Sequence, residues 1–191
     1  AAIFEVYYRM GSDKPLPRAK AMVNEPDPPT RAVGVRFVAK FEGPVALKGL
    51  HELVLDGSTL VRRAAVQAIA DFARVDSVES LGAALNDVDK SVKVAAIRGL
   101  GRIQDTSVIR HLTFVVGDRD PEVKREALMA LSGVHDPAVV PTLQMGLVDP
   151  SIVVRTAALR GMLESDPTNG RMYFQSALLW LPHDAIRDIA K

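Results

Sequence analysis

Residues 118–131 read DRDPEVKREALMAL, and related phrases recur as DVDKSVKVAAIRGL at 87–100 and DPSIVVRTAALRGM at 149–162. The phrases keep a step of 31 residues without an insertion, and a fixed step of this size indicates stacked supersecondary units. Each phrase contains an acid, then a valine followed by a base, then an alanine. These positions are Asp56, Asp87, Asp118 and Asp149; Val61, Val92, Val123 and Val154; Arg62, Lys93, Lys124 and Arg155; Ala65, Ala96, Ala127 and Ala158.

Each unit is predicted to contain two helices. Apolar residues from Val61 to Phe72 follow the i, i+4, i+7, i+8 spacing of one helix face rather than the alternation of a strand. A second segment with the same spacing runs from Val78 to Leu85, after Asp76 and Ser77, which are good N-cap residue types. Short connections make paired helices antiparallel, so the sequence predicts an all-α fold of helical hairpins.

The same step extends towards both ends of the chain. It places Ile3, Tyr7 and Met10 in the last part of a first helix, in a partial unit. We expect one domain over residues 1–191, either a segment of a longer chain or an array with reworked terminal caps. The predicted units are 1–25 (partial), 26–56, 57–87, 88–118, 119–149, 150–180 and 181–191 (partial or cap).

Composition limits the possible functions. The chain has 24 basic and 23 acidic residues and a net charge of +1, so it lacks the global field of a bulk nucleic-acid or membrane binder. It contains no cysteine, which excludes disulfides and thiolate metal sites and fits a reducing interior. We expect an intracellular soluble protein, in the cytoplasm or in an organelle matrix or stroma.

The repeated arrangement of acid, Val-base-x-x-Ala and leucine-rich second helix resembles HEAT-like repeats of the short type found in phycobilisome lyase subunits and many scaffold proteins. This resemblance implies a right-handed α-solenoid, an armadillo-type superhelix. It also implies a structural ladder in which the acid of one loop meets a base of the adjacent unit. Carried over to this chain, the ladder comprises Asp56, Arg62, Asp87, Lys93, Asp118, Lys124, Asp149 and Arg155.

The resemblance further implies that the first helix of each pair lines a concave surface. Exposed positions beside the base and four to five residues later then carry arginines in alternation, which predicts a basic stripe that binds an acidic segment of a protein partner. The partner-binding residues predicted on this face are Arg36, Arg63, Arg98, Arg102, Arg125, Met129 and Arg160, with the alanines Ala32, Ala64, Ala95 and Ala157 also exposed there.

Other interpretations remain open at this point. The stripe is also compatible with an ordinary solvated face, and phosphates of a nucleic-acid backbone are a weaker alternative partner. The resemblance allows an assembly or chromophore-lyase-like factor that acts with a second subunit, as well as a structural segment of a larger protein. The aromatic stretch from Tyr173 to Trp180 suits a cap, ordinary core or a docking patch.

Catalysis and metal binding find little support in the sequence. His51, His111, His135 and His183 occupy different positions of the repeat, so symmetry does not bring them together. The pair His51–Glu52 occurs once, whereas a di-iron site needs several such pairs. We therefore predict a protein without enzymatic activity, metal or cofactor.

Overall fold

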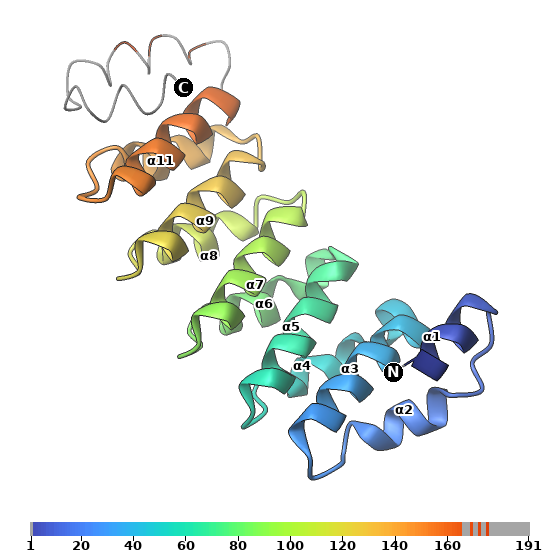
Figure 1. Ribbon diagram of the computed structural model, residues 1–191. Coiled ribbons are helices and arrows are strands. Elements are labelled where there is room, and N and C mark those ends of the chain that lie inside the picture. Colours follow the sequence, from blue (N-terminus) through green and yellow to red (C-terminus); the bar gives the residue numbers. More distant parts are fainter. Residues whose placement is uncertain (1, 166–168, 170–171, 173–174, 176–191) are drawn as a thin grey trace. The chain divides into compact units, whose positions relative to one another are not determined.

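In the computed structural model of this chain, residues 2–165, 169, 172 and 175 are described, and all regular secondary structure among them is helical (Figure 1). The chain divides into two compact units, Ala1–Gly99 and Leu100–Lys191. None of the helices in the described ranges is long and apolar enough to cross a bilayer.

The first unit contains consecutive helical hairpins. Figure 1 shows α3, α5 and α7 side by side in one row, with α4 and α6 in a second row. The first helices are α3 (Pro28–Glu42), α5 (Thr59–Phe72) and α7 (Lys90–Arg102), and the second helices are α4 (Leu47–Leu53) and α6 (Val78–Ala84). Short 3-10 turns, η1 (Gly43–Ala46) and η2 (Val75–Ser77), connect the two helices of a hairpin.

Helices α1 (Ala2–Arg9) and α2 (Leu16–Met22) precede these hairpins. Ile3 and Met10 are largely exposed. Phe4 faces inward instead, and its ring stacks on that of Phe37 with 4.6 Å between centroids. This contact joins two large rings, which no other repeat contains at the equivalent positions.

A close helix contact holds α2 against α3. A Cβ atom added to Gly34 would lie 2.8 Å from the backbone nitrogen of Val23 and 2.9 Å from the carbonyl oxygen of Ala19. Backbone atoms cannot move aside as flexible side chains do, so only glycine fits at this crossing.

The second unit repeats the hairpin design in α8 (Val108–Val115), α9 (Pro121–Ser132), α10 (Val140–Gly146) and α11 (Ile152–Ser165), with η3 (Pro137–Val139) before α10. The second helix predicted after α11, the stretch from Tyr173 to Trp180 and the terminal unit 181–191 lie outside the described residues, apart from residues 172 and 175. The division of the chain into one domain of repeat units remains a prediction.

The repeated valines and alanines form the core. Val61, Ala65, Val92 and Ala96 are completely buried in the first unit, and the equivalent residues of α9 and α11 are buried in the second. Small and β-branched side chains at these positions let neighbouring helices pack closely. Arg62 and Arg155, each between a valine and an alanine of this core, donate hydrogen bonds to loop carbonyls instead.

The N-cap predicted at Asp76 and Ser77 does not form, although an aspartate caps the equivalent turn of the second unit. Asp136 accepts a hydrogen bond from the Ala138 amide at 2.8 Å and so caps η3. Ser77, in contrast, makes no side-chain cap bond and is buried, and Asp76 pairs with Arg74 at the surface. The 3-10 turn explains the difference, since it continues directly into α6 without an extended residue at which a cap could form.

Candidate partner-binding groove

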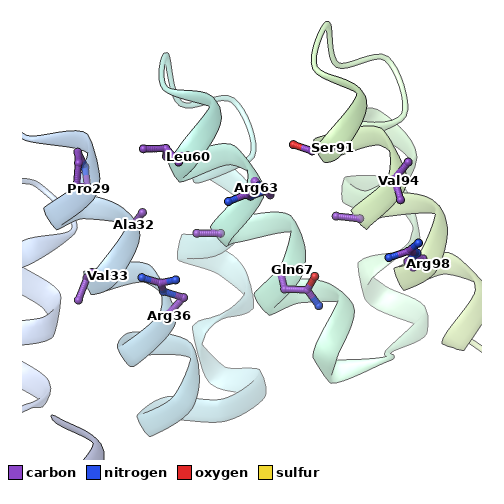
Figure 2. A pocket seen from close by; sticks show the side chains of 12 residues that line it. Pro29, Ala32, Val33, Arg36, Leu60, Arg63, Gln67, Ser91, Val94 and Arg98 are labelled. Atoms are coloured by element: carbon purple, nitrogen blue, oxygen red, sulfur yellow. The ribbon is translucent and has the colours of Figure 1, made fainter. Parts of the chain in front are cut away.

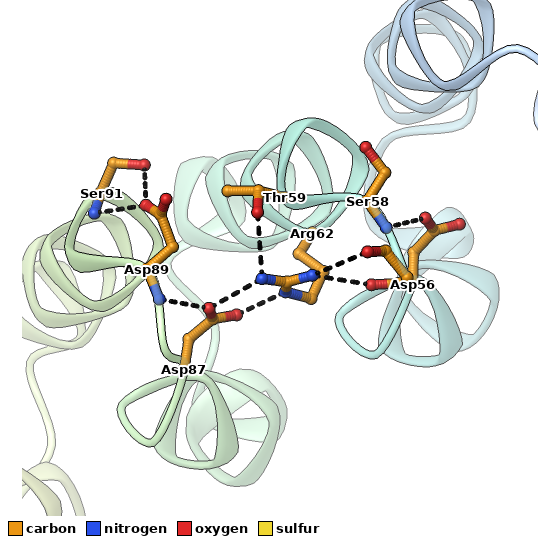
Figure 3. Close-up of polar contacts among 8 residues, drawn as sticks. Asp56, Ser58, Thr59, Arg62, Asp87, Asp89 and Ser91 are labelled. Atoms are coloured by element: carbon orange, nitrogen blue, oxygen red, sulfur yellow. Dashed lines mark hydrogen bonds and ion pairs between the residues drawn. The ribbon is translucent and has the colours of Figure 1, made fainter.

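Arginine 62 connects the two loops that flank its hairpin (Figure 3). Its Nε and Nη2 atoms donate to the two carboxylate oxygens of Asp87 at 2.6 and 2.9 Å. Its Nη1 atom donates to the carbonyl oxygen of Asp56 at 3.0 Å, and Nη2 also donates to the Thr59 hydroxyl at 3.2 Å. One planar guanidinium therefore holds the preceding and the following inter-hairpin loop at a fixed distance.

The same arrangement recurs at Arg31, which the sequence analysis did not include in the ladder. Arg31 donates to Asp56 through Nε at 3.1 Å and Nη2 at 3.0 Å, and to the carbonyl oxygens of Glu25 and Pro26 at 3.0 and 2.8 Å. The register itself would have identified this residue, because Arg31 lies 31 positions before Arg62.

The second unit contains one complete base-acid pair and part of another. Lys124 Nζ lies 2.6 Å from Asp149 Oδ2. Arg155 Nη1 donates to the carbonyl oxygens of Asp149 and Pro150 at 2.8 and 2.9 Å. Lysine cannot bridge both loops as arginine does, because its charge is a single point. Lys93 and Asp118 fall in different units, and their pairing remains a prediction.

The ladder carboxylates accept hydrogen bonds within their own loops and do not cap the following helices directly. Each accepts the amide two residues later, as Asp87 does from Asp89 at 2.8 Å and Asp149 from Ser151 at 2.8 Å. In α9 the N-cap residue is Asp120, two residues after Asp118. The carboxylate thus closes a tight turn, which aims its second oxygen at the base.

These contacts change the acidity of the carboxylates. The hydrogen bond from Arg62 lowers the pKa of Asp87 and outweighs the opposing effect of burial. Burial raises the pKa of Asp149, but the hydrogen bonds from Lys124 and the Ser151 amide lower it by more, so the net pKa is below the usual value. Both carboxylates are therefore held ionised in the folded state.

A groove of about 580 Å³ crosses the row of first helices in the first unit, on the side away from the second helices (Figure 2). Three arginines line it, one from each helix: Arg36 on α3, Arg63 on α5 and Arg98 on α7. Arg36 and Arg63 are exposed and make no hydrogen bond or ion pair with any described residue. The remaining lining residues are Pro29, Ala32, Val33, Leu60, Ala64, Gln67, Ser91, Val94 and Ala95.

The alanines of this groove form its floor. Ala32, Ala64 and Ala95 were expected to be exposed, but each is at most 9% exposed. A methyl group is short enough to be buried at this position, whereas the longer side chains of Arg36 and Arg63 extend into solvent. The groove therefore combines an apolar floor with guanidinium groups on its surface.

A second hollow of about 630 Å³ shares Arg36, Ala64 and Gln67 with this groove and continues towards α1. Here Lys40 Nζ contacts the Glu5 carboxylate at 2.8 and 2.9 Å and lies 4.5 Å from the centre of the Tyr8 ring. The hydrogen bond from Lys40 lowers the pKa of Glu5. The cationic surface thus ends at an acidic residue.

The second unit has a smaller groove of about 350 Å³. It brings together three of the predicted residues, Arg125 and Met129 of α9 and Arg160 of α11. Arg125 pairs with Glu126, whereas Arg160 is exposed. Ala157 was expected to be exposed but is buried in the floor of this groove. The other lining residues are Ile152, Val153 and Thr156.

Arg102 alone among the predicted residues lines none of these grooves; it is exposed on the last turn of α7. The sequence analysis missed Pro29, Leu60 and Ser91, which form one edge of the first groove. These three residues are 31 positions apart, so the register could have revealed them. They lie before the valine position of the repeat, whereas the predicted surface positions all follow the base.

The described residues contain no candidate metal site, because no group of three or more of their His, Cys, Asp or Glu side chains could hold a metal ion. His135 adopts a positive φ of 52° at the turn before η3, and His51 lies on the second helix α4. Neither residue is among those that line the grooves described above.

Comparison with known families agrees with this architecture. Residues 61–87 match the PBS lyase HEAT-like repeat, and residues 78–162 match HEAT repeats. Residues 61–162 thus belong to the HEAT-like repeats. The family matches confirm the resemblance to HEAT-like repeats, and the helices of the described residues confirm the predicted all-α class. No curated protein sequence matches the chain.

Solved structures share the HEAT-like fold at low sequence identity. The complex of CpcE and CpcF of phycocyanin lyase from Nostoc sp. PCC7120 matches with a TM-score of 0.65 and 21% identity, over 82% of this chain and 66% of that chain. Human deoxyhypusine hydroxylase matches with a TM-score of 0.59 and 19% identity, over 86% of this chain and 66% of that one. The chain thus spans less than two thirds of either protein's length.

A third similar structure is artificial. A computationally designed armadillo repeat protein for modular peptide recognition matches with a TM-score of 0.60 and 18% identity, over 92% of this chain and 97% of that chain. At such identities these likenesses concern the HEAT-like, armadillo-type solenoid fold.

Proposed function

We propose that this HEAT-repeat chain is a non-catalytic scaffold or adaptor that binds an acidic segment of a partner protein along the first helices. The observation that carries the proposal is the groove of the first unit, where Arg36, Arg63 and Arg98 stand around an apolar floor. Guanidinium groups form short, charge-assisted hydrogen bonds with carboxylates, and the floor offers apolar area to the segment between them.

The shape and chemistry of the groove favour a peptide over a nucleic acid. Its lining contains no aromatic side chain on which a base could stack, although stacking provides much of the affinity for single strands. The chain's net charge of +1 also gives no long-range attraction to a polyanion. A peptide, in contrast, can place carboxylates on the arginines and small apolar side chains on the alanines.

Fluorescence anisotropy with a labelled peptide that carries three glutamates tests this proposal. We expect the double variant Arg36→Glu and Arg98→Glu to lose at least about tenfold in affinity, equivalent to about 1.4 kcal/mol. The matched control is Lys48→Glu with Arg74→Glu, which changes the net charge equally at exposed positions away from the groove. Far-UV circular dichroism verifies that both variants retain their helical content.

Two results would overturn the proposal. Equal affinity of wild type and the groove variant would show that the arginines do not contact the peptide. Tighter binding of a labelled oligonucleotide than of the peptide, lost in the same groove variant, would favour the nucleic-acid alternative.

A second candidate function is an assembly or chromophore-lyase-like factor that acts with another subunit. It is favoured by the match of residues 61–87 to the PBS lyase HEAT-like repeat. This function predicts that the chain co-purifies from a native lysate with a bilin pigment or a HEAT-repeat partner subunit. A colourless protein without such a subunit would contradict it.

A further inference from the structure

The arginines of the two grooves follow a pattern that the repeat alone does not require. Arg36 and Arg98 occupy one position of the repeat and Arg63 another, four residues earlier, so the bases alternate between two levels from one first helix to the next. Figure 2 shows Arg63 nearer to the start of α5 than Gln67, which occupies the position of Arg36 and Arg98. In the second unit Arg125 and Arg160 repeat the step from Arg63 to Arg98, since each pair is 35 residues apart.

Two distances determine which ligand fits the groove: the offset of the arginines along the helix axes and the spacing between neighbouring first helices. Four residues along a helix correspond to about 6 Å, so the bases alternate by about one turn along the helix axes. Packed helices lie about 8–10 Å apart. An extended peptide rises about 3.3 Å per residue, so a strand that crosses the row of helices advances about three residues from one helix to the next.

Three is an odd number, and this decides the geometry. Successive side chains of an extended strand point to opposite sides, so residues i and i+3 point to opposite edges while i and i+6 share an edge. Acidic residues at i, i+3 and i+6 would therefore meet Arg36 at one level, Arg63 at the other and Arg98 at the first level again.

We infer that the groove of the first unit recognises an extended peptide with acidic residues at i, i+3 and i+6, crossing α3, α5 and α7. This inference rests on the proposed function and specifies the register of its ligand. The peptide backbone then lies over the floor formed by Ala32, Ala64 and Ala95, whose small methyl groups let it approach closely. The smaller groove of the second unit, with Arg125 and Arg160 on two helices, fits an i, i+3 pair in the same way.

Two peptides of identical composition test the register. The first has glutamates at i, i+3 and i+6, and the second has them at i, i+2 and i+6, so that only the middle acid moves, to the opposite edge. Both contain a proline between the acids, because the first spacing would also align the acids on a helix and proline excludes that conformation. Affinities for the full chain are measured by fluorescence anisotropy.

The first peptide should bind at least about fivefold more tightly than the second, and this preference should vanish in Arg63→Gln, which removes the charge that the middle acid meets. Lys48→Gln, away from the groove, should retain the preference. Arg98→Glu should lose affinity for the first peptide, and a lysine in place of one of the two terminal glutamates should restore it. Whether the lysine at i or the lysine at i+6 restores binding shows in which direction the peptide crosses the helices.

The outcomes separate this inference from the proposed function. If both peptides bind equally and reversal of Arg36 and Arg98 weakens both, the groove binds acidic peptides but reads no register, and the inference is wrong. If neither peptide binds the wild-type chain, both proposals fail. A preference for the second peptide, or a preference that survives in Arg63→Gln, would also refute the inference.

Discussion

The ion pair between Arg62 and Asp87 should contribute measurably to stability, and the variant Asp87→Ala tests this. The carboxylate accepts two hydrogen bonds from the guanidinium and one from the Asp89 amide. The pair is largely buried, with 14% of the Arg62 side chain and 6% of the Asp87 side chain exposed. Removal of one partner therefore leaves a desolvated charge without its counter-ion.

The expected loss follows from these contacts. Breaking a buried ion pair costs about 3–5 kcal/mol, and the lower limit applies because Arg62 keeps its bonds to the Asp56 carbonyl and Thr59. A loss of about 3 kcal/mol should lower the midpoint of thermal unfolding by about 6–12 °C for a chain of this size. Asp87→Asn should cost less, because its amide oxygen still accepts from Asp89.

The chain contains a matched control of similar geometry in a different environment. Arg74 also donates through Nε and Nη2 to a carboxylate, that of Asp76, at 3.1–3.2 Å, but both side chains are about half exposed. Solvent screens such a pair, so Asp76→Ala should leave the unfolding midpoint nearly unchanged. Urea titration followed by far-UV circular dichroism measures both variants.

The pH dependence gives the sign of the effect. Because the folded-state pKa of Asp87 is lowered, chiefly by the hydrogen bond from Arg62, its stabilisation is complete above the unfolded pKa of about 3.9 and is lost as the pH falls through the folded value. The difference between wild type and Asp87→Ala should hence narrow in acid. The reasoning would be refuted if Asp87→Ala lost as little stability at neutral pH as Asp76→Ala, or if the stability difference between wild type and Asp87→Ala grew on acidification.

Two further substitutions test the ladder and the helix crossing. Lys124→Arg should stabilise the chain by about 1 kcal/mol, because a guanidinium keeps the contact with Asp149 and also reaches the preceding loop carbonyls. Chemical denaturation measures this gain in the free energy of unfolding, and a loss of stability would contradict the prediction. Gly34→Ala should destabilise the chain by about 1–3 kcal/mol, because the added methyl group overlaps with backbone atoms of α2. Gly49→Ala, where a methyl group meets nothing within 4 Å, should stabilise it by up to about 1 kcal/mol. Equal shifts of the two thermal unfolding midpoints would contradict the close contact between α2 and α3.

The repeat register predicted the hairpins because the forces that set them are local and recur. Val61 and Ala65 illustrate this: one apolar face, a base between the two residues and an acid before the helix recur 31 residues later. A chance resemblance at one unit cannot persist over four units. Residues with the same neighbours in successive units then have the same burial, which is why the core was predictable.

Other features depend on contacts that do not recur. At the N-terminus, the burial of Phe4 instead of Ile3 follows from its stacking on Phe37, and the register contains no information about that pair. The buried floor alanines show a different limit. Ala64 lies beside the exposed Arg63, and whether a small side chain there is covered depends on the distance to the next helix, which spacing along the sequence does not determine.

The ladder and the groove share their helices, and this links stability with recognition. Arg62 and Arg63 are consecutive, and neighbours on a helix point about 100° apart, so one guanidinium bonds the loops while the next faces the groove. The two contacts of Arg62 hold both ends of its hairpin, and hence the position of α5 between α3 and α7. A peptide that reads the spacing of Arg36, Arg63 and Arg98 therefore depends on the ladder, so Asp87→Ala should weaken its binding although Asp87 lines no part of the groove.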